Sequence, residues 1–567
     1  MTKSQYLKVG RSAKNRIFGS IAPIRRFSSV ASPRHSNGTP IQMLVSEKFT
    51  ISNSRLAVIV VGIFTLAIGI ILSSIPWLDY IIMKNLKLLN GTLSYHYWHK
   101  PGVIRLTKVF IFNVTNPDGF LHNGEKPKLV EFGPFVYRED MEKVNTRFYD
   151  NGTTEFQHFK VLNFVPEMSI AGAEDLVFTV PNIPLLTLTT MANNLHWGIV
   201  WHGISGSLSW LRMEPFKKVN FHEFIWGYDS VITDVANRFL PKEKRPPQKM
   251  GIFLTRNGTL ADTATIFNGE KGWENFGYMD RLNGLDHLPY WDPPCNSIAA
   301  SEGSLFPPRS VTKSDIVHLY DKDLCRIWPM QYRYETTKKG IECGYYTPVD
   351  NIFSPEESEN STCFCGGLPC PPKGLQSISP CQFDAPLGIS FPHFLNAAPE
   401  LLNSVEGLSP DKEKHESFVK INSKLGVPLE ARIRIQLNLM VEHSTMGVVR
   451  DFPTFNFPVM WLEEGVEELP DHLQILLYLS TTFADRIVPY ITYGMAAFGG
   501  LILIVVFLRT YKNYIFTQQS IELGKRTLRR GSSFFTTGQQ KLMMLRESYT
   551  LLNSPLAETE TEQESST

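Results

Sequence analysis

Seven cysteines are the residues of this 567-residue chain whose types and spacing point most directly to chemistry. Three of them lie within eight residues, in Cys363-Phe-Cys365-Gly-Gly-Leu-Pro-Cys370. Zinc sites usually use Cys-x-x-Cys pairs or histidine partners, and neither accompanies this group, so disulfides are favoured and no metal or other cofactor is expected. Spacing alone does not choose the pairings with the other four, which are Cys295, Cys325, Cys343 and Cys381.

Five Asn-x-Ser/Thr sequons lie in the same central part of the chain as the cysteines. Such sites receive N-linked glycans in the secretory pathway, where disulfides also persist. The central part is therefore expected to face a secretory-pathway lumen or the cell exterior. The expected glycosylation sites are Asn90, Asn113, Asn151, Asn257 and Asn360.

Near the carboxyl end, the stretch RESYTLL fits two overlapping sorting signals. Glu547 with Leu551 and Leu552 fits an acidic dileucine signal, whereas Tyr549 with Leu552 fits a Tyr-x-x-apolar signal. Clathrin adaptors in the cytosol bind such patterns in an extended segment, although short matches also arise by chance. The signal can act only if this tail faces the cytosol.

Two apolar segments predict that the chain crosses a membrane twice. Residues 56–75 and 487–508 contain no Asp, Glu, Lys or Arg. At about 1.5 Å per helical residue, each can cross a hydrocarbon core of about 30 Å. A cleaved signal peptide is the alternative for the first segment, but its apolar core is long, begins far from Met1 and lacks an obvious small-x-small cleavage site.

The charges beside the two segments predict that both tails are cytosolic. Residues 1–55 carry ten Lys or Arg against the single acid Glu47, and a second basic group follows residue 508. Positive charge marks the cytosolic side of a span. The Arg- and Ser-rich start also resembles a mitochondrial transit peptide, but the cysteines and sequons between the spans argue against that compartment.

The chain is thus expected to have five parts. They are a basic cytosolic tail (1–55), a transmembrane helix (56–75), a disulfide-bonded, glycosylated ectodomain (76–486), a second transmembrane helix (487–508) and a cytosolic tail with the sorting signal (509–567). The net charge of +1 gives no sign of a nucleic-acid partner. The ectodomain shows no internal repeat or long linker, so one composite domain is expected.

Strands are predicted where apolar and polar residues alternate. Residues 431–443, ARIRIQLNLMVEH, alternate in this way, which predicts a strand with one apolar and one polar face. The apolar face could line a core or a cavity. Asn151-Gly152 and Asn257-Gly258 are predicted hairpin turns, because Asn-Gly suits the positive φ angles of such turns.

Residues 187–239 instead have apolar and aromatic residues at helical spacing. They predict two or three helices, broken near residues 203–209 and at Pro215. Burial between helices is the more common role of a tryptophan, and an exposed apolar patch for a partner is the alternative. The tryptophans of this region are Trp197, Trp201 and Trp210.

Five short motifs between the two apolar segments, taken in their order, resemble the class B scavenger receptors. They are Phe132-Gly-Pro-Phe-Val-Tyr137, Val180-Pro-Asn182, Trp226-Gly-Tyr228, Cys363-Phe-Cys365 and Phe391-Pro-His-Phe-Leu395. The family includes a fatty-acid translocase, a receptor for high-density lipoprotein and a lysosomal integral membrane protein. The resemblance runs from about residue 56 to about residue 508 and does not cover the tails.

The resemblance implies an α+β fold. Two transmembrane helices would flank an ectodomain with an antiparallel β-barrel-like core, an apical helical bundle at about 187–239 and an apolar tunnel leading towards the bilayer. It also implies the disulfides Cys295–Cys363, Cys325–Cys381 and Cys365–Cys370, which leave Cys343 as a free thiol.

The resemblance further implies lipid, lipoprotein or fatty-acid ligands at the apex. Some members carry a lysine on the apical helices before the Trp-Gly-Tyr motif, and Trp210 lies near that position in this sequence. Lys217 and Lys218 lie nearer to the motif. The candidate ligand-binding residues are therefore Trp197, Trp201, Trp210, Lys217 and Lys218.

An enzyme is not expected. Gly203-Ile-Ser-Gly-Ser207 lacks the last glycine of a Gly-x-Ser-x-Gly elbow, and the sequence contains no His-Glu-x-x-His zinc helix and no phosphate loop. The expected function is that of a membrane receptor that binds lipid or lipoprotein and mediates its endocytic uptake or its transfer through the tunnel.

The expected location is the lysosomal or late endosomal membrane, the plasma membrane, or both. The lysosomal location is expected because lysosomal members of the class B scavenger receptors carry an acidic dileucine signal similar to Glu547–Leu552. One alternative is a trafficking receptor that carries a luminal protein to lysosomes. Another is a plasma-membrane receptor for phagocytic recognition.

Overall fold

A computed structural model of the chain describes residues 52–193, 198–239, 245, 247–309, 311–354, 359–365, 369–515 and 523. The chain divides into two units, Met1–Val60 and Val61–Thr567. In the first unit the structure describes only the beginning of helix α1 (Asn53–Ser74). The sheet, the cavity and the charged clusters described below all belong to the second unit.

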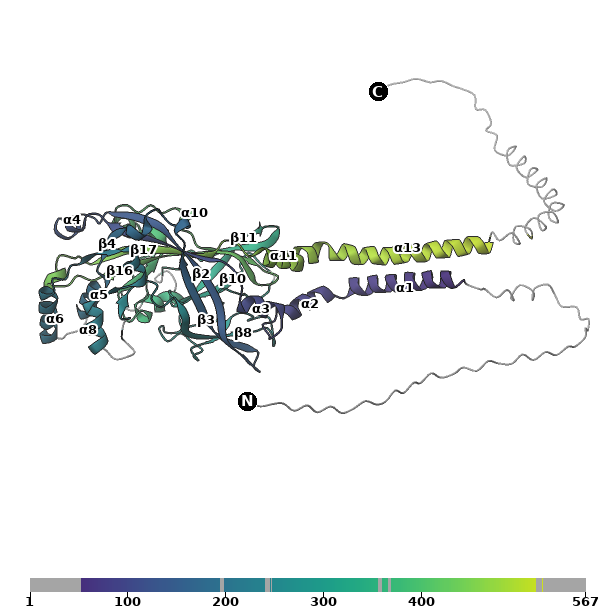
Figure 1. Ribbon diagram of the computed structural model, residues 1–567, viewed down its shortest axis with the longest axis horizontal. Helices are drawn as coiled ribbons and strands as arrows, with labels where there is room; N and C mark the ends of the chain where they lie inside the picture. Colours follow the sequence, from purple (N-terminus) through teal and green to yellow (C-terminus); the bar gives the residue numbers. More distant parts are fainter. Residues whose placement is uncertain are drawn as a thin grey trace, which may run out of the picture. The chain divides into compact units, whose positions relative to one another are not determined.

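A 13-stranded antiparallel sheet is the framework of the second unit (Figure 1). Eleven of its strands follow one another in the order β10-β11-β12-β15-β16-β17-β1-β2-β3-β8-β9. Their bounds are Arg105–Val114 (β1), Leu129–Tyr149 (β2), Thr153–Phe164 (β3), Gly258–Phe267 (β8), Met279–Leu282 (β9), Ile316–Asp321 (β10), Arg326–Lys338 (β11), Ile341–Pro348 (β12), Phe418–Asn422 (β15), Val427–Val441 (β16) and Phe455–Val466 (β17). The remaining two, β13 (Gln376–Ser377) and β14 (Leu387–Ser390), pair beside β16.

The two ends of this strand path are joined through the segment around Ser301. Ser301 forms a parallel bridge with Leu319 of β10 and an antiparallel bridge with Tyr278, the residue before β9. These are isolated bridges, so the sheet curves into a barrel-like form without a continuous closing ladder. This architecture confirms the antiparallel α+β fold expected from the sequence.

The alternating strand predicted at 431–443 is β16, but both of its faces are covered. Its polar residues Arg434, Gln436 and Asn438 are no more than 3% exposed. Asn438 donates to the Ser390 hydroxyl of β14 at 3.0 Å, and Gln436 accepts from the backbone N–H of His393 at 2.7 Å. The polar face is therefore buried instead of facing water, and its polar groups are paired with neighbouring parts of the chain.

The helical region predicted at 187–239 is present, although it contains a strand. It comprises α5 (Ile183–Asn193), α6 (Gly198–Trp210), β5 (Phe216–Asn220), α7 (Phe221–Trp226) and α8 (Val231–Phe239), and β5 pairs with β4 (Val177–Pro181). The break predicted near 203–209 is wrong: the hydroxyls of Ser207 and Ser209 donate to the carbonyls of Gly203 and Ser205, four residues back in the same helix. The break at Pro215 is confirmed.

Of the two predicted Asn-Gly turns, only one joins two strands. Asn151-Gly152 connects β2 to β3, and Gly152 has a φ of +84°. The prediction at Asn257-Gly258 is wrong, because Gly258 is the first residue of β8 and the segment before it forms turns and not a strand that pairs with β8. Gly258 nevertheless has a φ of +89°, the conformation that Asn-Gly favours there.

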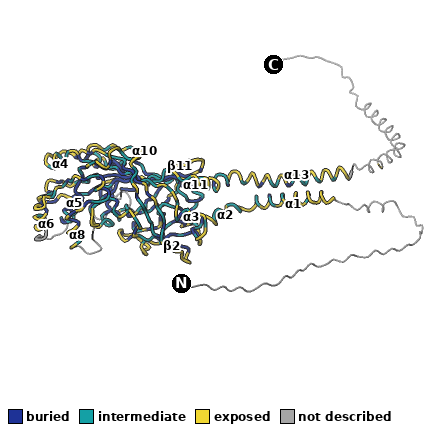
Figure 2. The backbone as a smooth tube through the Cα atoms, viewed as in Figure 1, coloured by how far each residue is buried: buried dark blue, intermediate teal, exposed yellow. Residues whose placement is uncertain are grey.

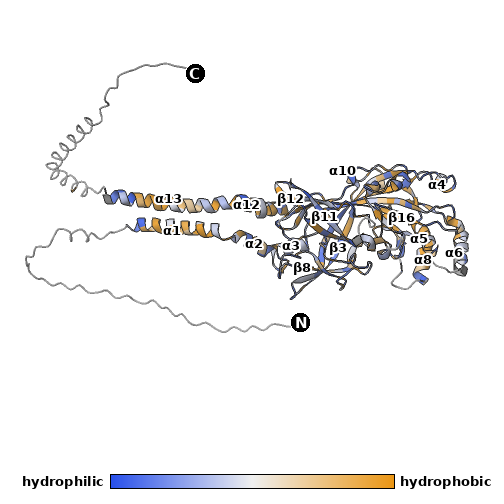
Figure 3. Ribbon diagram, turned by 180° about the vertical axis from the view of Figure 1, so that it is seen from behind, coloured by the Kyte–Doolittle hydropathy of each residue, from blue (hydrophilic) through white to orange (hydrophobic). Residues whose placement is uncertain are grey.

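Two helices are long and apolar enough to cross a membrane. They are α1, with 22 residues, and α13 (Val488–Ile515), of which 26 residues qualify. Figure 3 shows both as mainly hydrophobic, and Figure 2 shows them as mainly exposed. From Val61 onward α1 packs closely on α13, since a Cβ added to Gly69 would lie 2.5 Å from the backbone nitrogen of Ala496. Close approach of this kind is typical of small residues, here glycine and alanine, at the contacts between membrane helices.

Short helices connect the two spans to the sheet (Figure 1). α2 (Trp77–Leu86) and α3 (Leu93–His99) follow α1. α11 (Asp471–Tyr478), the π-helical turn η10 (Leu479–Phe483) and α12 (Ala484–Arg486) precede α13. These membrane-proximal helices pack on the sheet through an apolar cluster that includes the buried residues Leu86, Trp98, Phe156, Leu425 and Leu477.

Candidate functional site

A cavity of about 930 Å³ lies inside the sheet, against the membrane-proximal helices. Most of its lining is apolar and comes from α2, α3, α11 and strands β8, β9, β15 and β16. Representative apolar lining residues are Ile82, Leu86, Ala264, Leu425, Ile433 and Leu477. A cavity of this size and lining can hold a hydrocarbon chain.

Two groups of charged side chains interrupt the apolar lining. The first charged cluster consists of Arg105, Glu139, Lys143, His158, Lys160 and Glu302. The second charged cluster consists of Arg256, Asp321, Asp323 and Glu464. Eight of these ten residues line the cavity, and the other two, Glu139 and Arg256, are paired with residues that do.

The centre of the first charged cluster is an ion pair between Lys143 of β2 and Glu302. Lys143 is 1% exposed, and its Nζ lies 2.6 Å from the Ser304 hydroxyl and 3.3 Å from Glu302 Oε1. His158 Nε2 lies 3.3 Å from the other carboxylate oxygen of Glu302. The ammonium also lies over the Trp98 ring, at 4.9 Å from its centroid.

Burial and pairing oppose each other in this cluster. Desolvation raises the pKa of the Glu302 carboxyl, but the charges of Lys143 and His158 outweigh it and hold that pKa well below its usual range. Burial lowers the pKa of the Lys143 ammonium and of the His158 imidazole. Glu302 is therefore a permanent anion in the cavity wall.

The second carboxylate of the first charged cluster is Glu139, which two cations share. Glu139 Oε1 lies 3.1 Å from Lys160 Nζ and 3.6 Å from a guanidinium nitrogen of Arg105. Burial raises the pKa of the Glu139 carboxyl, but Arg105 and Lys160 bring it down to about 2. The side chain of Arg105 is 31% exposed and lines the cavity.

The second charged cluster has more carboxylates than cations. Arg256 donates to both Asp323 and Glu464, and its guanidinium is the cation that these acids share. Asp321 Oδ1 accepts the backbone N–H groups of Asp323, at 2.9 Å, and Leu324, at 3.2 Å. Burial raises the pKa of the Asp321 carboxyl to about 7, and the nearby charges of Asp323 and Glu464 add to this effect.

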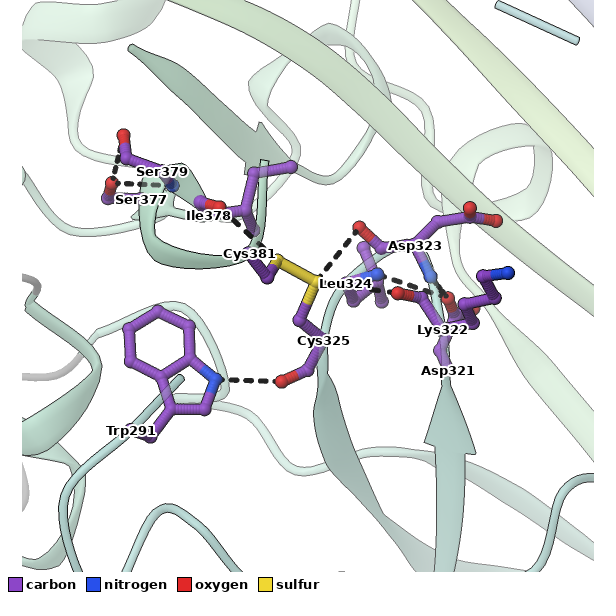
Figure 4. Close-up of a disulfide and its surroundings, with 10 residues drawn as sticks. All are labelled: Trp291, Asp321, Lys322, Asp323, Leu324, Cys325, Ser377, Ile378, Ser379 and Cys381. Carbon is purple, nitrogen blue, oxygen red and sulfur yellow. Dashed lines mark hydrogen bonds between the residues drawn. A yellow bond between two sulfur atoms is a disulfide. The ribbon is translucent and has the colours of Figure 1, made fainter. Parts of the chain in front are cut away.

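A disulfide holds the turn that carries Asp321 and Asp323 (Figure 4). Cys325 follows this turn between β10 and β11 and is bonded to Cys381. The Trp291 indole N–H donates to the Cys325 carbonyl at 2.7 Å, and the backbone N–H of Cys381 donates to Ile378 at 3.1 Å. The cross-link and these bonds hold the chain directly after Asp321 and Asp323, which are two of the four members of the second charged cluster.

The other two disulfides join Cys295 to Cys363 and Cys365 to Cys370. The three pairs are the same as those that the family resemblance implies. Cys343 is a free thiol, buried in β12, and burial raises its pKa to about 11. A thiol held in the protonated form in this way is a poor nucleophile.

The predicted apical tryptophans lie partly outside the described residues. Trp210 ends α6 and is 82% exposed, which is unusual for an indole. Trp201 belongs to α6, but its side chain is outside the described part of the structure, as is the whole of Trp197. The two predicted lysines are on β5: Lys217 Nζ lies 3.8 Å from the centroid of the Tyr228 ring, and Lys218 is exposed. Trp210, Lys217 and Lys218 do not line the cavity.

The predicted glycosylation sites have different surroundings. Asn90, Asn151 and Asn257 are exposed, whereas Asn113 is half-buried in β1 and its side-chain oxygen accepts the backbone N–H of Thr179 at 2.8 Å. The side chain of Asn360 and the sorting residues Glu547, Tyr549, Leu551 and Leu552 lie outside the described residues. Within the described residues, no group of His, Cys, Asp and Glu has the arrangement of a metal site.

The two charged clusters were not predicted from the sequence. One signal was available on β2, where Glu139, Met141 and Lys143 occupy every second position and so share one face of the strand. Charged residues on the inward face of a strand mark an interior polar site. The partner of Lys143 could not be found in the same way, because Glu302 is far away in the sequence.

The arrangement is suited to binding and not to a reaction. The clusters offer fixed charges at the wall of an apolar space, so an amphiphile could place its polar group beside them and its hydrocarbon chain along the apolar lining. Each cation of the clusters already has a carboxylate partner, and no activated nucleophile with an adjacent base lines the described cavity wall.

Comparison with known proteins places the chain in a family. Residues 59–510 match the CD36 family. The chain is 29% identical to scavenger receptor class B member 1 of Bos taurus over 432 residues, which cover 75% of this chain and 82% of that protein. It is 32% identical to lysosome membrane protein 2 of Mus musculus over 431 residues, with 75% and 88% covered, and 31% identical to the Homo sapiens protein of that name over 434 residues.

These similarities confirm three expectations. The chain is a membrane protein, it is a receptor and not an enzyme, and the family from which its fold was expected is the correct one. The named relatives are compatible with the plasma membrane or the lysosome as its location. The match from residue 59 to residue 510 spans the ectodomain and nearly all of both apolar helices, and the chain therefore belongs to the CD36 family, the class B scavenger receptors.

Proposed function

We propose that this receptor binds lipid or lipoprotein ligands at its ectodomain and transfers lipid through the cavity to the bilayer, as part of endocytic uptake. The observation that carries this proposal is the cavity of about 930 Å³, which is lined by the same short helices that lead into the two spans. Lipid held there would be one layer of helices away from the membrane. Transfer would require binding and release, without catalysis.

The first experiment measures whether the cavity holds lipid. The full chain is purified in a mild detergent, washed, extracted and examined for bound lipid by mass spectrometry. We expect bound lipid in the unaltered protein and a strong reduction in Ala264→Trp, because Ala264 is 8% exposed and lines the cavity. Ala261→Trp is the matched control on the exposed side of the same strand.

Either of two results would contradict lipid binding in the cavity. One is the absence of co-purifying lipid from well-folded protein. The other is an equal lipid content in the two tryptophan variants, which would place the bound lipid elsewhere. Correct folding is checked by the resistance of the three disulfides to alkylation, so that a misfolded Ala264→Trp protein is recognised.

We place this receptor in the endolysosomal system, with both tails in the cytosol. The support is the Glu547–Leu552 signal, about 40 residues beyond the second span, together with the similarity to lysosome membrane protein 2. Antibody labelling of intact cells should show a marked rise in surface protein for Leu551→Ala/Leu552→Ala. Leu556→Ala, in the same tail, is the control. Equal surface levels would favour lipid uptake or phagocytic recognition at the plasma membrane.

A second function, the transport of a luminal protein, is favoured by Trp210. An indole that is 82% exposed at the end of α6 is a typical anchor for a protein partner. Proximity labelling from the ectodomain should then mark a luminal protein in cells with the unaltered receptor and lose it in Trp210→Ser, while the lipid content stays the same. If the labelled proteins are unchanged, Trp210 does not hold such a partner.

A further inference from the structure

Helix α2 separates the cavity from the surface that leads into the first span. Ile82 and Leu86 line the cavity. On the same helix, Tyr80 is 71% exposed and Ile81 is 45% exposed. Ile81 also lines the cavity, so it lies at the boundary between the interior space and the outside.

The helices that precede the second span also have one apolar face that lines the cavity and another that is exposed. Leu473 and Leu477 of α11 line the cavity, whereas Ile475 is 60% exposed and Leu479, the first residue of η10, is 48% exposed. Tyr478, 42% exposed, lies between them. On both sides of the cavity, apolar side chains thus point away from the protein.

The bilayer is the partner that fits these outward-facing residues. Only two residues separate α1 from α2, and one residue separates α12 from α13, so the exposed apolar side chains are close to the end of each span. Tyrosines such as Tyr80 and Tyr478 favour the boundary between hydrocarbon and water. The same residues facing water would leave a large apolar surface unpaired.

A lysine connects the two sides. Lys424, in the turn between β15 and β16, lies with its Nζ 3.1 Å from Asp79 of α2 and donates to Asp485 of α12. The turn itself is firmly placed: the Gly426 carbonyl accepts the backbone N–H of Phe306 at 2.7 Å, and a Cβ on Gly426 would lie 1.7 Å from the Phe306 carbonyl oxygen. Lys424 therefore forms ion pairs with both α2 and α12 from a turn that is held rigidly against the sheet.

The two sides are not held equally. On the α12 side, the Thr482 hydroxyl donates to the Gly340 carbonyl at 3.1 Å and Arg486 pairs with Glu342, so the β11–β12 turn also holds it. The α2 side is held by less. Among the described residues, the side chains of Trp77–Lys84 make one polar contact with another part of the chain, and that contact is the Asp79–Lys424 ion pair. Loss of that pair would release α2 first.

We infer that α2 is a lateral lid of the cavity, latched by Lys424, through which an amphiphilic lipid passes between the cavity and the lipid leaflet on the ectodomain side. The lid moves away from α11 when the Asp79–Lys424 pair opens, and the apolar faces of the two helices are then continuous from cavity to bilayer. This inference rests on the proposed lipid transfer and adds the route and the element that controls it.

The test follows a fluorescent fatty acid in two steps. The full chain is placed in phosphatidylcholine nanodiscs that contain a quencher lipid, and the fatty acid is supplied from a soluble carrier, with empty nanodiscs as background. A rise in fluorescence reports loading of the cavity, and the later fall reports passage into the quenching bilayer. Loading tests the proposed function, whereas the rate of the fall tests the lid.

Lys424→Met and Asp79→Asn should each make the fall roughly three- to fivefold faster, the factor expected from losing an exposed ion pair, and leave the loaded amount unchanged. Lys424→Arg should keep the original rate because it keeps the pair. Asp485→Asn should also keep it, since α12 has its other contacts. Lys412→Met, at a lysine that is 76% exposed, is the matched control.

An unchanged rate in both Lys424→Met and Asp79→Asn, with normal loading, would overturn the latch while lipid binding stands. No loading in the unaltered protein would overturn the proposed function itself.

The direction of opening is tested by replacing the quencher lipid with cyclodextrin in solution. If the two variants accelerate release to cyclodextrin as much as to the bilayer, the lid opens to water and the lateral route is wrong. Asp79 is 56% exposed, so its substitution leaves the folded core intact.

Discussion

The two charged clusters share one cavity wall but balance their charges differently. In the first, the carboxylates of Glu139 and Glu302 face four basic side chains, one of them the imidazole of His158, and both carboxyl pKa values are held low. In the second, three carboxylates share the guanidinium of Arg256, and the pKa of Asp321 is raised to about 7. The number of cations per carboxylate decides whether a buried acid is a permanent charge or one that responds to pH.

The difference has a consequence for the proposed endolysosomal location, where the receptor would meet both neutral and acidic pH. A lowered pKa means that Glu139 and Glu302 contribute stability above about pH 4.5 and lose it only as the pH falls towards 2. A raised pKa means the opposite for Asp321: the cost of its ionisation grows as the pH rises from about 4 to about 7, is complete above pH 7 and disappears on acidification. The second charged cluster alone is expected to change between cell surface and lysosome.

The largest effect is expected from breaking the central pair of the first charged cluster. Lys143→Met leaves Glu302 as a buried carboxylate without its ammonium, so we expect the free energy of unfolding to fall by about 3–5 kcal/mol. Chemical denaturation of the full chain in detergent would measure it. Lys100→Met is the control, because the Lys100–Glu142 pair is exposed and should contribute less than about 1 kcal/mol. Equal losses would remove the distinction between buried and exposed pairs.

The next effect concerns the disulfide that holds the second charged cluster. Cys325→Ser/Cys381→Ser opens a loop of 56 residues, and the chain-entropy argument predicts a loss of about 4 kcal/mol. Cys365→Ser/Cys370→Ser opens a loop of only 5 residues and should cost about 2 kcal/mol. Thermal unfolding of the two variants would compare them.

A second readout separates entropy from the position of the cluster. If the Cys325–Cys381 disulfide positions Asp321, removal of the disulfide should also weaken the pH dependence that Asp321 gives to the free energy of unfolding. A loss of stability with an unchanged pH dependence would show that the backbone bonds to Asp321 are sufficient on their own.

The third effect depends on pH and is expected at Asp321. Asp321→Asn keeps the acceptor for the N–H groups of Asp323 and Leu324 but removes the unfavourable charge. At pH 8 the variant should be more stable by up to about 4 kcal/mol, because the rise of the pKa from 3.8 to about 7 is about three units and each unit corresponds to about 1.4 kcal/mol. The difference should shrink as the pH falls and vanish near pH 4. A constant difference across this range would contradict the raised pKa.

The smallest effect is expected from the exposed pair beside the second charged cluster. Lys322 lies 2.6 Å from Asp262, but the two side chains are 48% and 34% exposed. Lys322→Ala should change the free energy of unfolding by less than about 1 kcal/mol and should leave the pH profile unchanged. A larger change would mean that the charge of Lys322 acts on the second charged cluster. The net negative charge of that cluster would then be smaller than its four members alone indicate.

The sequence was most informative where a pattern is local. Periodicity located β16 and the apical helices, and apolar length located the two helices that can span a membrane. The sequence prediction was wrong at residues 203–209, where glycine and serine suggested a break in the helix. The helix continues there because the serine hydroxyls donate to carbonyls of the same helix. The sequence prediction also failed at Asn257, where a favourable turn dipeptide precedes a strand without following one.

The cavity and its charges depend on contacts that the sequence does not display. Lys143 and the Ser304 hydroxyl are 161 positions apart, and Arg256 and Glu464 are 208 apart. Nothing in the surroundings of either residue along the chain indicates its partner, because the pairing is set by the order of the strands in the sheet. The family resemblance implied a tunnel, but it did not indicate that charged side chains line part of the interior.

The order of the cysteines along the chain has a consequence for biosynthesis. The Cys295–Cys363 and Cys325–Cys381 disulfides interleave, so with the proposed topology Cys295, Cys325 and Cys343 would all enter the lumen before Cys363, the first correct partner. Three thiols are then free to form wrong bridges, which only thiol–disulfide exchange can undo. Cys343 becomes unreactive once the sheet buries it. Secretory cells that make this receptor therefore need an isomerase as well as an oxidant, until residue 381 has been translocated.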